Sequence, residues 1–503
     1  MPAPSSVRNL ADLVRRGAFM RPDAHAVISD DRRITWRELD QMIEATASGL
    51  LRHGLLPGDR VALVLSNVPE FVVTYFAALR AQLVVVPINT GYGPDELGDV
   101  LHQAAPALVV AEAGTVAAVM ACAGATPILV VGEPSYDALL RAGQRADATA
   151  VPPTGDFNPE SLALVMFTPG VKGEPVGAML THRALLANIS QLQSMPSPAT
   201  KSGDVVLVVL PLYHVYALGA VLGTAAAVGA TCVLVERFDP VETLQTIVAN
   251  KVTNLPGTPP MYLAWSRLPG AAAALAGVET LVSGAAALGP SLLAQLTEFT
   301  GRPVWEGYGM TEASPVVATT LVDRRPTPGS VGPPLPGVTV RLVDDQGDDA
   351  HEGDPGEILL RGDNLFSGYW PDGTGGPDED GWWATGDVAY LDEHGGLHLV
   401  DRRRDVVMVS GFPVYPFEVE TVICSHPEVA EAAVIGEPSD ASGFTVKAYV
   451  VALTGEDLTA ESVSVFCRTH LARFKCPTEV EIVAALPHTP SGKVVRALLR
   501  SDV

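Results

Sequence analysis

The stretch RVALVLSNVPEFVVTYFAALRAQLVVVPIN, residues 60–89, decides the fold class of this chain. Two of its segments, Arg60 to Ser66 and Leu83 to Asn89, are short and apolar throughout, as strands buried on both faces of a sheet should be. The segment between them has a helical pattern. Because strands that alternate with helices form parallel units, we predict an α/β fold for the N-terminal half.

The bulk composition limits the possible functions. With 503 residues the chain is too long for one core, and with 47% hydrophobic and 18% charged residues it should be globular. Its 33 basic and 57 acidic residues give a net charge of −24, which argues against a general nucleic-acid or anionic-membrane surface. The five cysteines form no CxxC pair. This favours a reducing cytoplasm over a disulfide framework or a zinc site.

Neither the N-terminus nor the long uncharged stretch in the first half of the chain predicts a membrane anchor. The N-terminus lacks the apolar core of a signal peptide and predicts a short amphipathic helix. No charged residue occurs between Asp204 and Glu236, a length that could span a bilayer. However, Pro211, Tyr213 and His214 interrupt that stretch, so we expect a strand, a loop, a helix and a strand inside the α/β core and no transmembrane segment.

The pattern of apolar and turn residues changes toward the C-terminus. Around residues 320–400, short strand-like runs separated by Gly, Pro and Asp predict a smaller β-rich subdomain. The charged run DRRRD then precedes about a hundred residues with their own helix and strand signals. We predict a large N-terminal domain over 1–400, a hinge at 401–405 and a small, mobile α+β domain over 406–503.

The stretch FTPGVKGEPVG, residues 167–177, follows the apolar run LALVMF. A strand that runs into a Gly-rich loop suggests backbone close to a phosphate. Its lysine, Lys172, is not followed by the Ser or Thr that a Walker A loop requires. Beyond the loop, Thr181 is a plausible N-cap for a helix over LTHRALLANI. The loop therefore raises the question whether it holds a nucleotide.

Six motifs occur in a fixed order over most of the chain. They are EGYGMTEA (306–313), GSVGPPLPG (329–337), GWWATGD (381–387), DRRRDVVMVSGFPVYPFEVE (401–420), LARFKCP (471–477) and LPHTPSGKVVR (486–496). Together they resemble the adenylate-forming enzymes, which include acyl-CoA synthetases, firefly luciferase and the adenylation domains of peptide synthetases. The resemblance covers essentially the whole chain and implies an AMP-forming acid–thiol ligase.

The resemblance implies a reaction in two steps and a set of nucleotide contacts. ATP and a carboxylate would give an acyl-adenylate and pyrophosphate, and a thiol, usually that of coenzyme A, would then displace AMP. By this resemblance, Tyr308 would stack on adenine, Thr311 would bind the α-phosphate and Glu312 would hold Mg²⁺ through its carboxylate. Asp387 and Arg402 would bind the ribose hydroxyls, and Ala285 and Ala286 would line the nucleotide and acyl site.

The resemblance also implies roles for five further residues. Lys493, in TPSGK, would bridge the carboxylate and the α-phosphate and stabilise the charge that develops during attack. Arg404 would lie at the hinge about which the small domain rotates between the two steps. Gly411 would lie by the thiol tunnel, Lys475 would meet coenzyme A phosphates, and His214 would stand beside the acyl pocket and gate access.

In this family the stretch at 168–177 should read close to TSGTTGxPKG, the loop that wraps the β- and γ-phosphates. Here Thr168, Gly170, Gly173, Pro175 and Gly177 are kept, whereas Pro169, Val171, Lys172 and Val176 replace a serine, two threonines and a lysine. Each lost phosphate contact should cost about 1 to 3 kcal/mol, although glycine backbone N–H groups and Mg²⁺ carry part of the binding. Lys172 restores one charge.

Three functions stay open at this point. The first is an active acyl-CoA ligase with an unusual phosphate loop. The second is a non-catalytic or half-reaction descendant that binds nucleotide or acyl group, and the third is an adenylating enzyme with another acceptor, such as a carrier-protein thiol. The intact Glu312, Asp387, Arg402 and Lys493 favour the first.

The segments expected around the acyl pocket are apolar and contain no Arg or Lys. A dicarboxylate would need a cation for its second carboxylate, so malonate-like acids are disfavoured. Gly307 and the alanines at 285–287 leave room for an extended chain. We expect a medium- or long-chain fatty acid as the substrate, with an aryl acid as the alternative.

Overall fold

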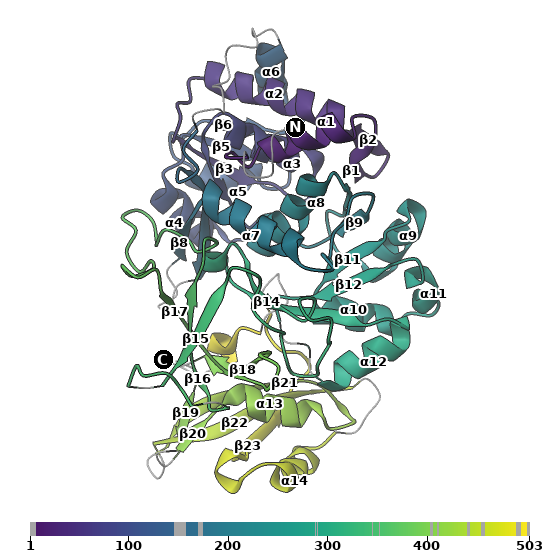
Figure 1. Cartoon of the computed structure of the whole chain (residues 1–503), viewed down its shortest axis with the longest axis vertical. Helices are drawn as coiled ribbons and strands as arrows, with labels where there is room; N and C mark the ends of the chain where they lie inside the picture. The colour runs from purple at the N-terminus through teal and green to yellow at the C-terminus, as the bar shows by residue number, and fades with distance from the viewer. Residues whose placement is uncertain are drawn as a thin grey trace.

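The computed structural model describes residues 7–144, 157–169, 175–286, 288, 290–344, 346–351, 353–402, 406–409, 412–439, 443–453, 458–488 and 494–499. These residues form four β-sheets with helices packed around them. Figure 1 shows the chain running from the N-terminal helices and sheet at the top to the C-terminal sheet at the base. The mixture of helices and strands confirms the predicted α/β class.

The first sheet contains the predicted strand–helix–strand unit. β3 (Arg60–Val64) and β4 (Val84–Pro87) pair in parallel on either side of α3 (Pro69–Arg80), which confirms the prediction. The six strands lie in the order β6-β5-β3-β4-β7-β8, and the β7–β8 pair is antiparallel. The other elements of this region are β5 (Leu108–Ala111), β6 (Ile128–Val130), β7 (Leu162–Pro169), β8 (Pro175–Thr181), α4 (Pro94–Ala104), α5 (Val116–Cys122) and α6 (Pro134–Gln144).

The second sheet has eight strands in the order β14-β13-β12-β11-β9-β10-β1-β2. Neighbours pair in parallel from β13 to β1, and the edge strands β14 and β2 are antiparallel. Its strands are β1 (His25–Ser29), β2 (Arg32–Thr35), β9 (Val205–Val208), β10 (Thr231–Leu234), β11 (Asn254–Gly257), β12 (Thr280–Ser283), β13 (Val304–Gly309) and β14 (Val316–Thr319).

The remaining helices of this part of the chain include the one expected after Thr181. The Thr181 hydroxyl caps α7 by accepting from the backbone N–H of Ala184 at 3.1 Å, as predicted. The helices are α1 (Asp12–Met20), α2 (Trp36–Arg52), α7 (His182–Ser194), the π-helix η2 (Tyr216–Gly223), α8 (Thr224–Val228), α9 (Pro240–Asn250), α10 (Pro259–Ser266), α11 (Ala271–Leu275), α12 (Pro290–Thr300) and the 3₁₀ turn η3 (Thr311–Ala313).

The uncharged stretch between Asp204 and Glu236 folds as β9, a loop, η2 with α8, and β10. Its strands lie in the interior of the eight-stranded sheet, and Leu207 and Val233 are almost completely buried. This confirms the expected strand, loop, helix and strand. In the part of the chain that the structure describes, no helix has both the length and the apolar character needed to cross a bilayer.

The predicted β-rich subdomain is a four-stranded antiparallel sheet. It consists of β15 (Thr339–Val343), β16 (Gly356–Arg361), β17 (Trp383–Leu391) and β18 (Leu397–Arg402). Its core includes Ile358 and Ala389, and the same hydrophobic cluster contains Tyr308 from β13. The small sheet therefore packs directly against the edge of the eight-stranded sheet.

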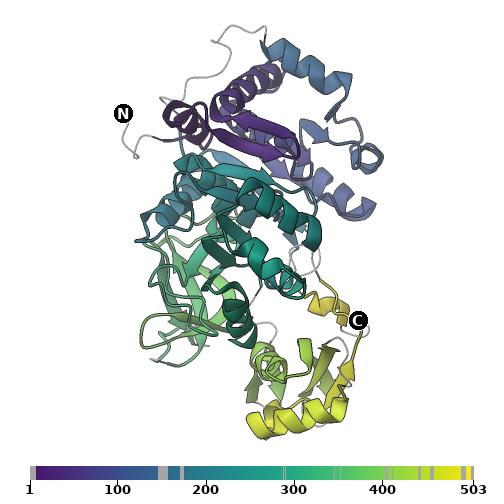
Figure 2. The ribbon, with the colours of Figure 1, turned by 90° about the vertical axis from the view of Figure 1, so that its right-hand side faces the viewer.

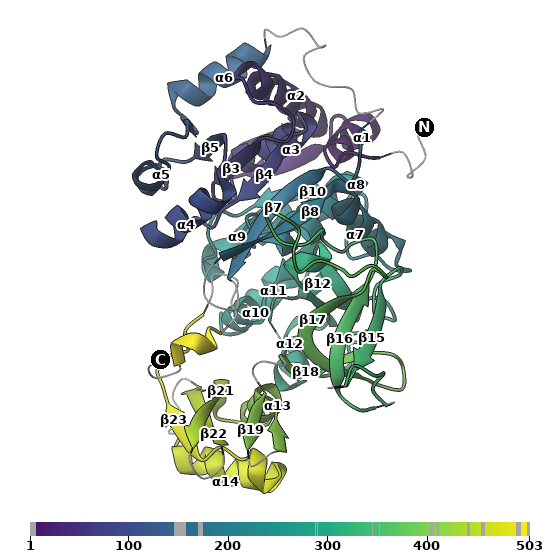
Figure 3. The same cartoon turned by 90° about the vertical axis from the view of Figure 1, so that its left-hand side faces the viewer.

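The C-terminal sheet has its own hydrophobic core, which includes Val434, Ala448 and Val463. Figures 2 and 3 both show this sheet and its helices beyond the rest of the molecule. The elements are β19 (Val407–Val409), β20 (Phe412–Val414), β21 (Val429–Ser439), β22 (Gly443–Ala452), β23 (Glu479–Ile482), α13 (Pro416–Cys424), α14 (Ala460–His470) and the 3₁₀ turns η4 (Arg473–Lys475) and η5 (Arg496–Leu499). The domain limits at 401–405 remain predictions.

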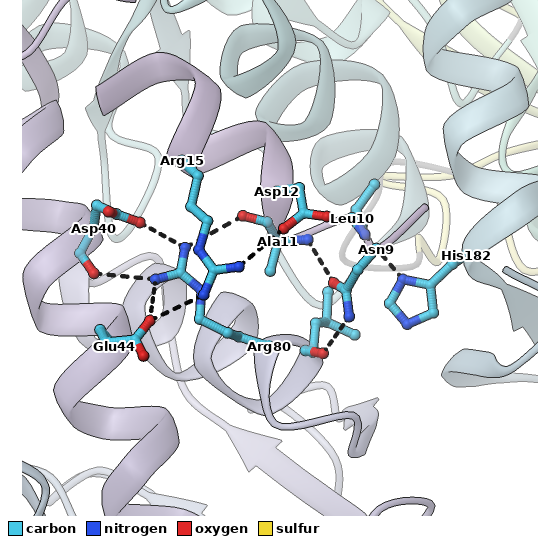
Figure 4. Close-up of polar contacts among 10 residues, drawn as sticks. Asn9, Leu10, Ala11, Asp12, Arg15, Asp40, Glu44, Arg80 and His182 are labelled. Atoms are coloured by element: carbon cyan, nitrogen blue, oxygen red, sulfur yellow. Dashed lines mark hydrogen bonds and ion pairs between the residues drawn. The ribbon is translucent and has the colours of Figure 1, made fainter. Parts of the chain in front are cut away.

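A buried arginine ties the N-terminal helix to the first sheet (Figure 4). Arg80, at the end of α3, is 1% exposed and its Nη2 lies 2.6 Å from the Asp40 carboxylate. Its Nη1 lies 3.2 Å from the carboxylate of Glu44, which also pairs with Arg15 of α1 at 3.2 Å. Because a buried charge without a partner is costly, this cluster fixes α1 and α2 against α3.

Arg80→Met should lower the free energy of unfolding by about 3 kcal/mol, near the lower end for a broken buried pair, because Asp40 and Glu44 remain partly in solvent. Urea-induced unfolding would measure this change. The matched control is Arg37→Met, because Arg37 pairs with Asp23 where both side chains are exposed, and exposed pairs contribute little. Equal losses for the two variants would contradict the role of the buried cluster.

Candidate active site

A cavity opens at the carboxyl edge of the eight-stranded sheet, where the chain leaves β9, β11, β12 and β13. In open parallel sheets, ligands bind in the crevice at this edge. The centres of water molecules can occupy about 110 Å³ of the cavity. Its walls come from the end of α7 and the loop after it (Leu192, Gln193, Met195, Ala199, Thr200), from His214–Tyr216 and η2, from strand ends (Val206, Asn254, Pro256, Val282–Ala285, Gly307–Met310) and from Pro315, Val316, Thr319 and Leu321.

The described residues that line the cavity include no Arg or Lys, which is the character that we expected of an acyl pocket. All four segments that we expected around the acyl pocket contribute to these walls: PLYHVYALG (211–219), NLPGTPPMY (254–262), VSGAAAL (282–288) and EGYGMTEASPVV (306–317). The contribution of Leu192 to Thr200 was not expected, because nothing in that part of the sequence distinguishes a cavity wall from the end of an ordinary surface helix. The tertiary fold alone brings α7 beside the carboxyl edge of the sheet.

His214, the predicted gate, lines the cavity beside Tyr216. Its Nδ1 accepts from the backbone N–H of Tyr216 at 3.3 Å, and its backbone N–H donates to the Pro211 carbonyl at 2.9 Å. Both contacts lie within one turn of the loop, so the ring is oriented locally. His214 is thus placed next to any acyl group that enters the cavity.

Two buried hydroxyl groups in the cavity wall lack a hydrogen-bond partner among the described residues. They are the Tyr216 hydroxyl and the Ser283 hydroxyl. Burial also raises the pKa of Tyr216 well above its ordinary value, so this group stays a neutral donor. Because an unpaired buried hydroxyl is costly, both can stabilise a polar atom of a ligand. Sequence reasoning missed both, although Tyr216 lies only two positions from His214.

Tyr308 and Asp387 meet across the two neighbouring sheets. Tyr308, on β13, lines the cavity, and its hydroxyl donates to Asp387 Oδ2 at 2.6 Å. Asp387 lies on β17, where its backbone N–H donates to the Thr385 hydroxyl at 3.0 Å. Across β17 and β18, Asp387 is in register with the backbone of Arg402, whose side chain lies outside the described part of the structure. The fold therefore joins three predicted nucleotide positions that are far apart in sequence.

Ala285 and Ala286 follow β12 directly. Ala285 lines the cavity and has a φ of 67°, a left-handed conformation that is unfavourable for a residue other than glycine. Such strain persists only where the surroundings enforce it, and it is concentrated at functional sites. The predicted position of Ala285 at the acyl and nucleotide site fits this observation.

Thr311 and Glu312 form the short η3 turn just after β13. The Glu312 carboxylate accepts from the Tyr369 hydroxyl at 2.8 Å, and the Glu312 carbonyl accepts from the backbone N–H of Phe366 at 2.9 Å. Sequence reasoning missed Tyr369, because no local pattern links two residues 57 positions apart. Tyr369 therefore orients the carboxylate that we expected to hold a cation.

The described residues contain no cluster of three or more His, Cys, Asp or Glu side chains that could hold a metal by themselves. A single oriented carboxylate at Glu312 nevertheless fits Mg²⁺, which proteins commonly bind through one or two carboxylates together with substrate phosphates and water. The donor set thus suits a metal that arrives with a nucleotide.

The altered phosphate loop joins β7 and β8, which form an antiparallel hairpin. Thr168 pairs with Val176 in that hairpin, whereas Gly170, Lys172 and Gly173 lie outside the described residues. A side chain at Gly177 would approach Val165 Cγ1 within 2.7 Å, so packing requires this glycine. The backbone N–H of Trp370 donates to the Gly177 carbonyl at 2.7 Å, which places the hairpin next to Tyr369 and Glu312.

The remaining predicted residues belong to the C-terminal region. Lys475 Nζ lies 2.7 Å from each carboxylate oxygen of Glu418, so an incoming phosphate would compete with this ion pair. Lys493, Arg404 and Gly411 lie outside the described residues. Just beyond Lys493, Arg496 pairs with Glu420 at 2.7 Å, which anchors that end of the chain to α13.

Comparison with known proteins decides the family. The model of the AMP-binding enzyme family matches residues 14–370, and the model of its C-terminal domain matches residues 418–493. The chain belongs to the AMP-binding enzyme family. This membership confirms the resemblance drawn from the six motifs.

Its relatives span the whole chain. It is 33% identical to a long-chain-fatty-acid–CoA ligase of Yersinia pestis, over 99% of this chain and 95% of the relative. It is 36% identical to a feruloyl-CoA synthase of an Amycolatopsis species, over 96% and 97% of the two chains. Among solved structures, the ATP-bound MatB of Rhodopseudomonas palustris is 32% identical and superposes with a TM-score of 0.89, covering 98% of each chain. These findings confirm the fold and the class of AMP-forming acid–thiol ligase, and they leave the acid open.

Tyr308→Phe tests the contact between the two sheets. The variant removes a hydrogen bond to a carboxylate, which is worth about 1.5 to 3 kcal/mol, so Asp387 should lose its fixed orientation and the dissociation constant of ATP should rise at least tenfold. Isothermal titration with ATP would measure it. Tyr136→Phe is the matched control, because the Tyr136 hydroxyl bonds Thr74 at 2.9 Å in the first sheet region. Unchanged ATP binding by Tyr308→Phe would contradict the expected role of the pair.

Proposed function

We propose that this chain is an ATP-dependent acyl-CoA ligase for an apolar monocarboxylic acid, in the first place a medium- or long-chain fatty acid. The observation that carries the proposal is the cavity, which is apolar, has no Arg or Lys among its described lining residues, and adjoins the Tyr308–Asp387 pair. An apolar acyl group gains free energy when it enters such a cavity. A second carboxylate would find no cation in these walls.

In the first half-reaction, a carboxylate oxygen of the acid attacks the α-phosphorus of ATP and pyrophosphate leaves. Tyr308 and Asp387 position adenine and ribose, together with Arg402, while Ala285 and Ala286 form the adjoining wall. Thr311 donates to the α-phosphate, and Glu312 would hold Mg²⁺, which would neutralise phosphate charge. Lys493 bridges the carboxylate and the α-phosphate, where its cation stabilises the developing negative charge.

In the second half-reaction, the coenzyme A thiol attacks the acyl carbonyl carbon and AMP leaves. We propose that residues 401–405, with Arg404 among them, form the hinge between a domain over 1–400 and a mobile domain over 406–503. Gly411 then lies along the thiol path, Lys475 exchanges Glu418 for a coenzyme A phosphate, and His214 gates the acyl group. The free cysteines and the use of ATP and coenzyme A fit a cytoplasmic enzyme.

The altered loop at 168–177 need not abolish the first half-reaction. The hairpin that carries it is held to the Tyr369 segment by backbone hydrogen bonds, among them Met179 N–H to the Gly368 carbonyl at 3.0 Å. Glycine N–H groups and Lys172 would supply the remaining phosphate contacts. The non-catalytic and carrier-protein alternatives therefore stand behind the acyl-CoA ligase.

A second candidate substrate is an aryl acid with a polar ring substituent. It is favoured by the unpaired hydroxyls of Tyr216 and Ser283 in the cavity wall, and the Amycolatopsis relative is named as a feruloyl-CoA synthase. A purely alkyl acid would leave both hydroxyls unsatisfied. A phenolic hydroxyl or methoxy oxygen could accept from Tyr216.

Pyrophosphate release with Mg-ATP tests the proposed function. We expect release that depends on one class of acid, increases with coenzyme A, and falls at least a hundredfold in Lys493→Ala because the charge on the α-phosphate is then uncompensated. The acids would be fatty acids of graded length and a set of aryl acids. No release with any acid, while ATP still binds, would instead support the non-catalytic alternative.

Tyr216→Phe separates the two substrate classes. If the substrate is a hydroxylated aryl acid, loss of one neutral hydrogen bond of about 1 kcal/mol should raise its KM about fivefold, with no effect on an unsubstituted aryl acid. If the substrate is a fatty acid, the same variant should leave KM unchanged or lower it, because an unpaired polar atom has been removed. The measurement is the KM of each acid in the pyrophosphate assay.

Tyr369→Phe tests the orientation of the Glu312 carboxylate. Loss of a hydrogen bond to a charged acceptor should raise the concentration of free Mg²⁺ needed for half-maximal rate about tenfold. Steady-state rates at fixed ATP and varied Mg²⁺ would show this shift, with Tyr136→Phe again as the control. A Mg²⁺ dependence identical to that of the unchanged protein would count against Glu312 as the metal-binding carboxylate.

A further inference from the structure

A buried carboxyl group at Glu306 has no role in the contacts described so far. Glu306 lies on β13, is 5% exposed, and begins the EGYG motif that continues to Tyr308. Its Oε1 accepts from the backbone N–H of Leu288 at 2.8 Å. Its Oε2 is buried and has no hydrogen-bond partner among the described residues.

Hydrogen bonds hold both the backbone N–H and the backbone carbonyl of Glu306, so its side chain starts from a fixed position. Its N–H donates to the Thr320 hydroxyl at 2.9 Å. Its carbonyl accepts from the Thr319 hydroxyl at 2.8 Å and from the Thr320 N–H at 2.9 Å. The direction of the side chain toward Leu288 is therefore set by the sheet rather than by the loop it contacts.

The segment that Glu306 contacts is anchored at both ends. At one end, the Gly284 N–H donates to the Gly257 carbonyl at 3.1 Å. At the other, the Leu288 side chain is 1% exposed and its N–H is bound by Glu306. Between these anchors lies Ala285, with its left-handed φ of 67° in the cavity wall. A strained conformation needs such external support.

We propose that Glu306 is a positioning residue whose carboxyl group latches Leu288, and so holds the Ala285 wall in the shape that binds nucleotide and acyl group. This inference deepens the proposed ligase function and rests on it for its kinetic readout. Without the latch, the Leu288 N–H would be buried without an acceptor, at the full cost of its desolvation. The segment would then move to expose that N–H to water, and Ala285 would move with it.

The chemistry of a carboxyl group makes the latch sensitive to pH. Burial raises the pKa of Glu306 to about 8, and the hydrogen bond from Leu288 opposes this shift. The groups that face Glu306 are Leu288 from the latched segment, Ser283 in register on β12, Thr319 at the end of β14 and Thr320 just after it. None of these four titrates in this range. A neutral carboxyl group is therefore the form that fits the site near neutral pH.

Glu306→Gln and Glu306→Leu test the latch, because the first keeps an acceptor at Oε1 and the second does not. We expect Glu306→Gln to keep the KM values for acid and ATP within threefold at pH 7. Glu306→Leu should raise at least one of them about tenfold, with a smaller change in kcat. The control is Glu112→Gln, since Glu112 accepts from the Ser66 N–H at 3.1 Å outside this site. Equal KM values for the Leu and Gln variants, whether both are unchanged or both are raised, would overturn the proposal.

The pH dependence supplies a second readout. Above about pH 8 the wild-type carboxyl group ionises without a second partner, so the KM of the wild type should rise there while that of Glu306→Gln stays flat. The folded state also holds the proton more tightly than the unfolded state, whose pKa is the ordinary 4.5. The melting temperature of Glu306→Gln, relative to that of the wild type, should therefore rise from about pH 5 to 8 and stay constant above that. A constant difference over this range would overturn the proposal.

The two measurements separate failure of the latch from failure of the proposed function. If the wild type releases no pyrophosphate with any acid, the ligase function fails. ATP titrations of Glu306→Leu and Glu306→Gln still decide the latch: weaker binding by the Leu variant alone supports it, and equal binding by the two variants overturns it. If Glu306→Leu does not fold, Glu306→Ala, which also lacks an acceptor for the Leu288 N–H, takes its place in the comparison with Glu306→Gln.

Discussion

This structure depends on one constraint: when parallel strands are buried on both faces of a sheet, the chain can leave the sheet only at the ends of the strands. β9, β11, β12 and β13 run in the same direction, so the residues that follow them gather at one edge. His214, Ala285 and Tyr308 are far apart in sequence yet line one cavity for this reason. The apolar side chains that fill the sheet leave this edge as the place where polar chemistry can be built.

Of the eight buried side-chain polar atoms that lack a partner among the described residues, four lie at or near this edge. Among the described residues, the Tyr216 and Ser283 hydroxyls, the second oxygen of Glu306 and the Ser314 hydroxyl all lack a hydrogen bond, and each lies in the cavity wall or in a segment that leads into it. An interior chosen for stability alone would satisfy such groups. The four near the cavity, together with the left-handed Ala285, fit a wall that gives up some stability to leave polar atoms for a ligand.

The carboxylate of Glu312 and the altered hairpin form one connected unit. Tyr369 donates to Glu312, and the neighbouring Trp370 bonds the Gly177 carbonyl through its backbone. Among the described residues, β8 is held beside Glu312 by backbone hydrogen bonds and by a glycine that packing requires. These contacts explain how a loop that departs from its family at four positions can keep the hairpin in place.

The sequence by itself determined the α/β class, the β-rich region before the C-terminal part, the cap at Thr181 and the family, because hydrophobic periodicity, turn residues and ordered motifs are local signals. It also predicted Tyr308, Asp387 and Glu312, each from its own motif, as positions of the nucleotide site. Only the tertiary structure decided that Tyr308 bonds Asp387, that Tyr369 orients Glu312 and that Glu306 reaches Leu288. These contacts join residues 79, 57 and 18 positions apart, and their partners are set by strand order and register, which local sequence patterns do not encode.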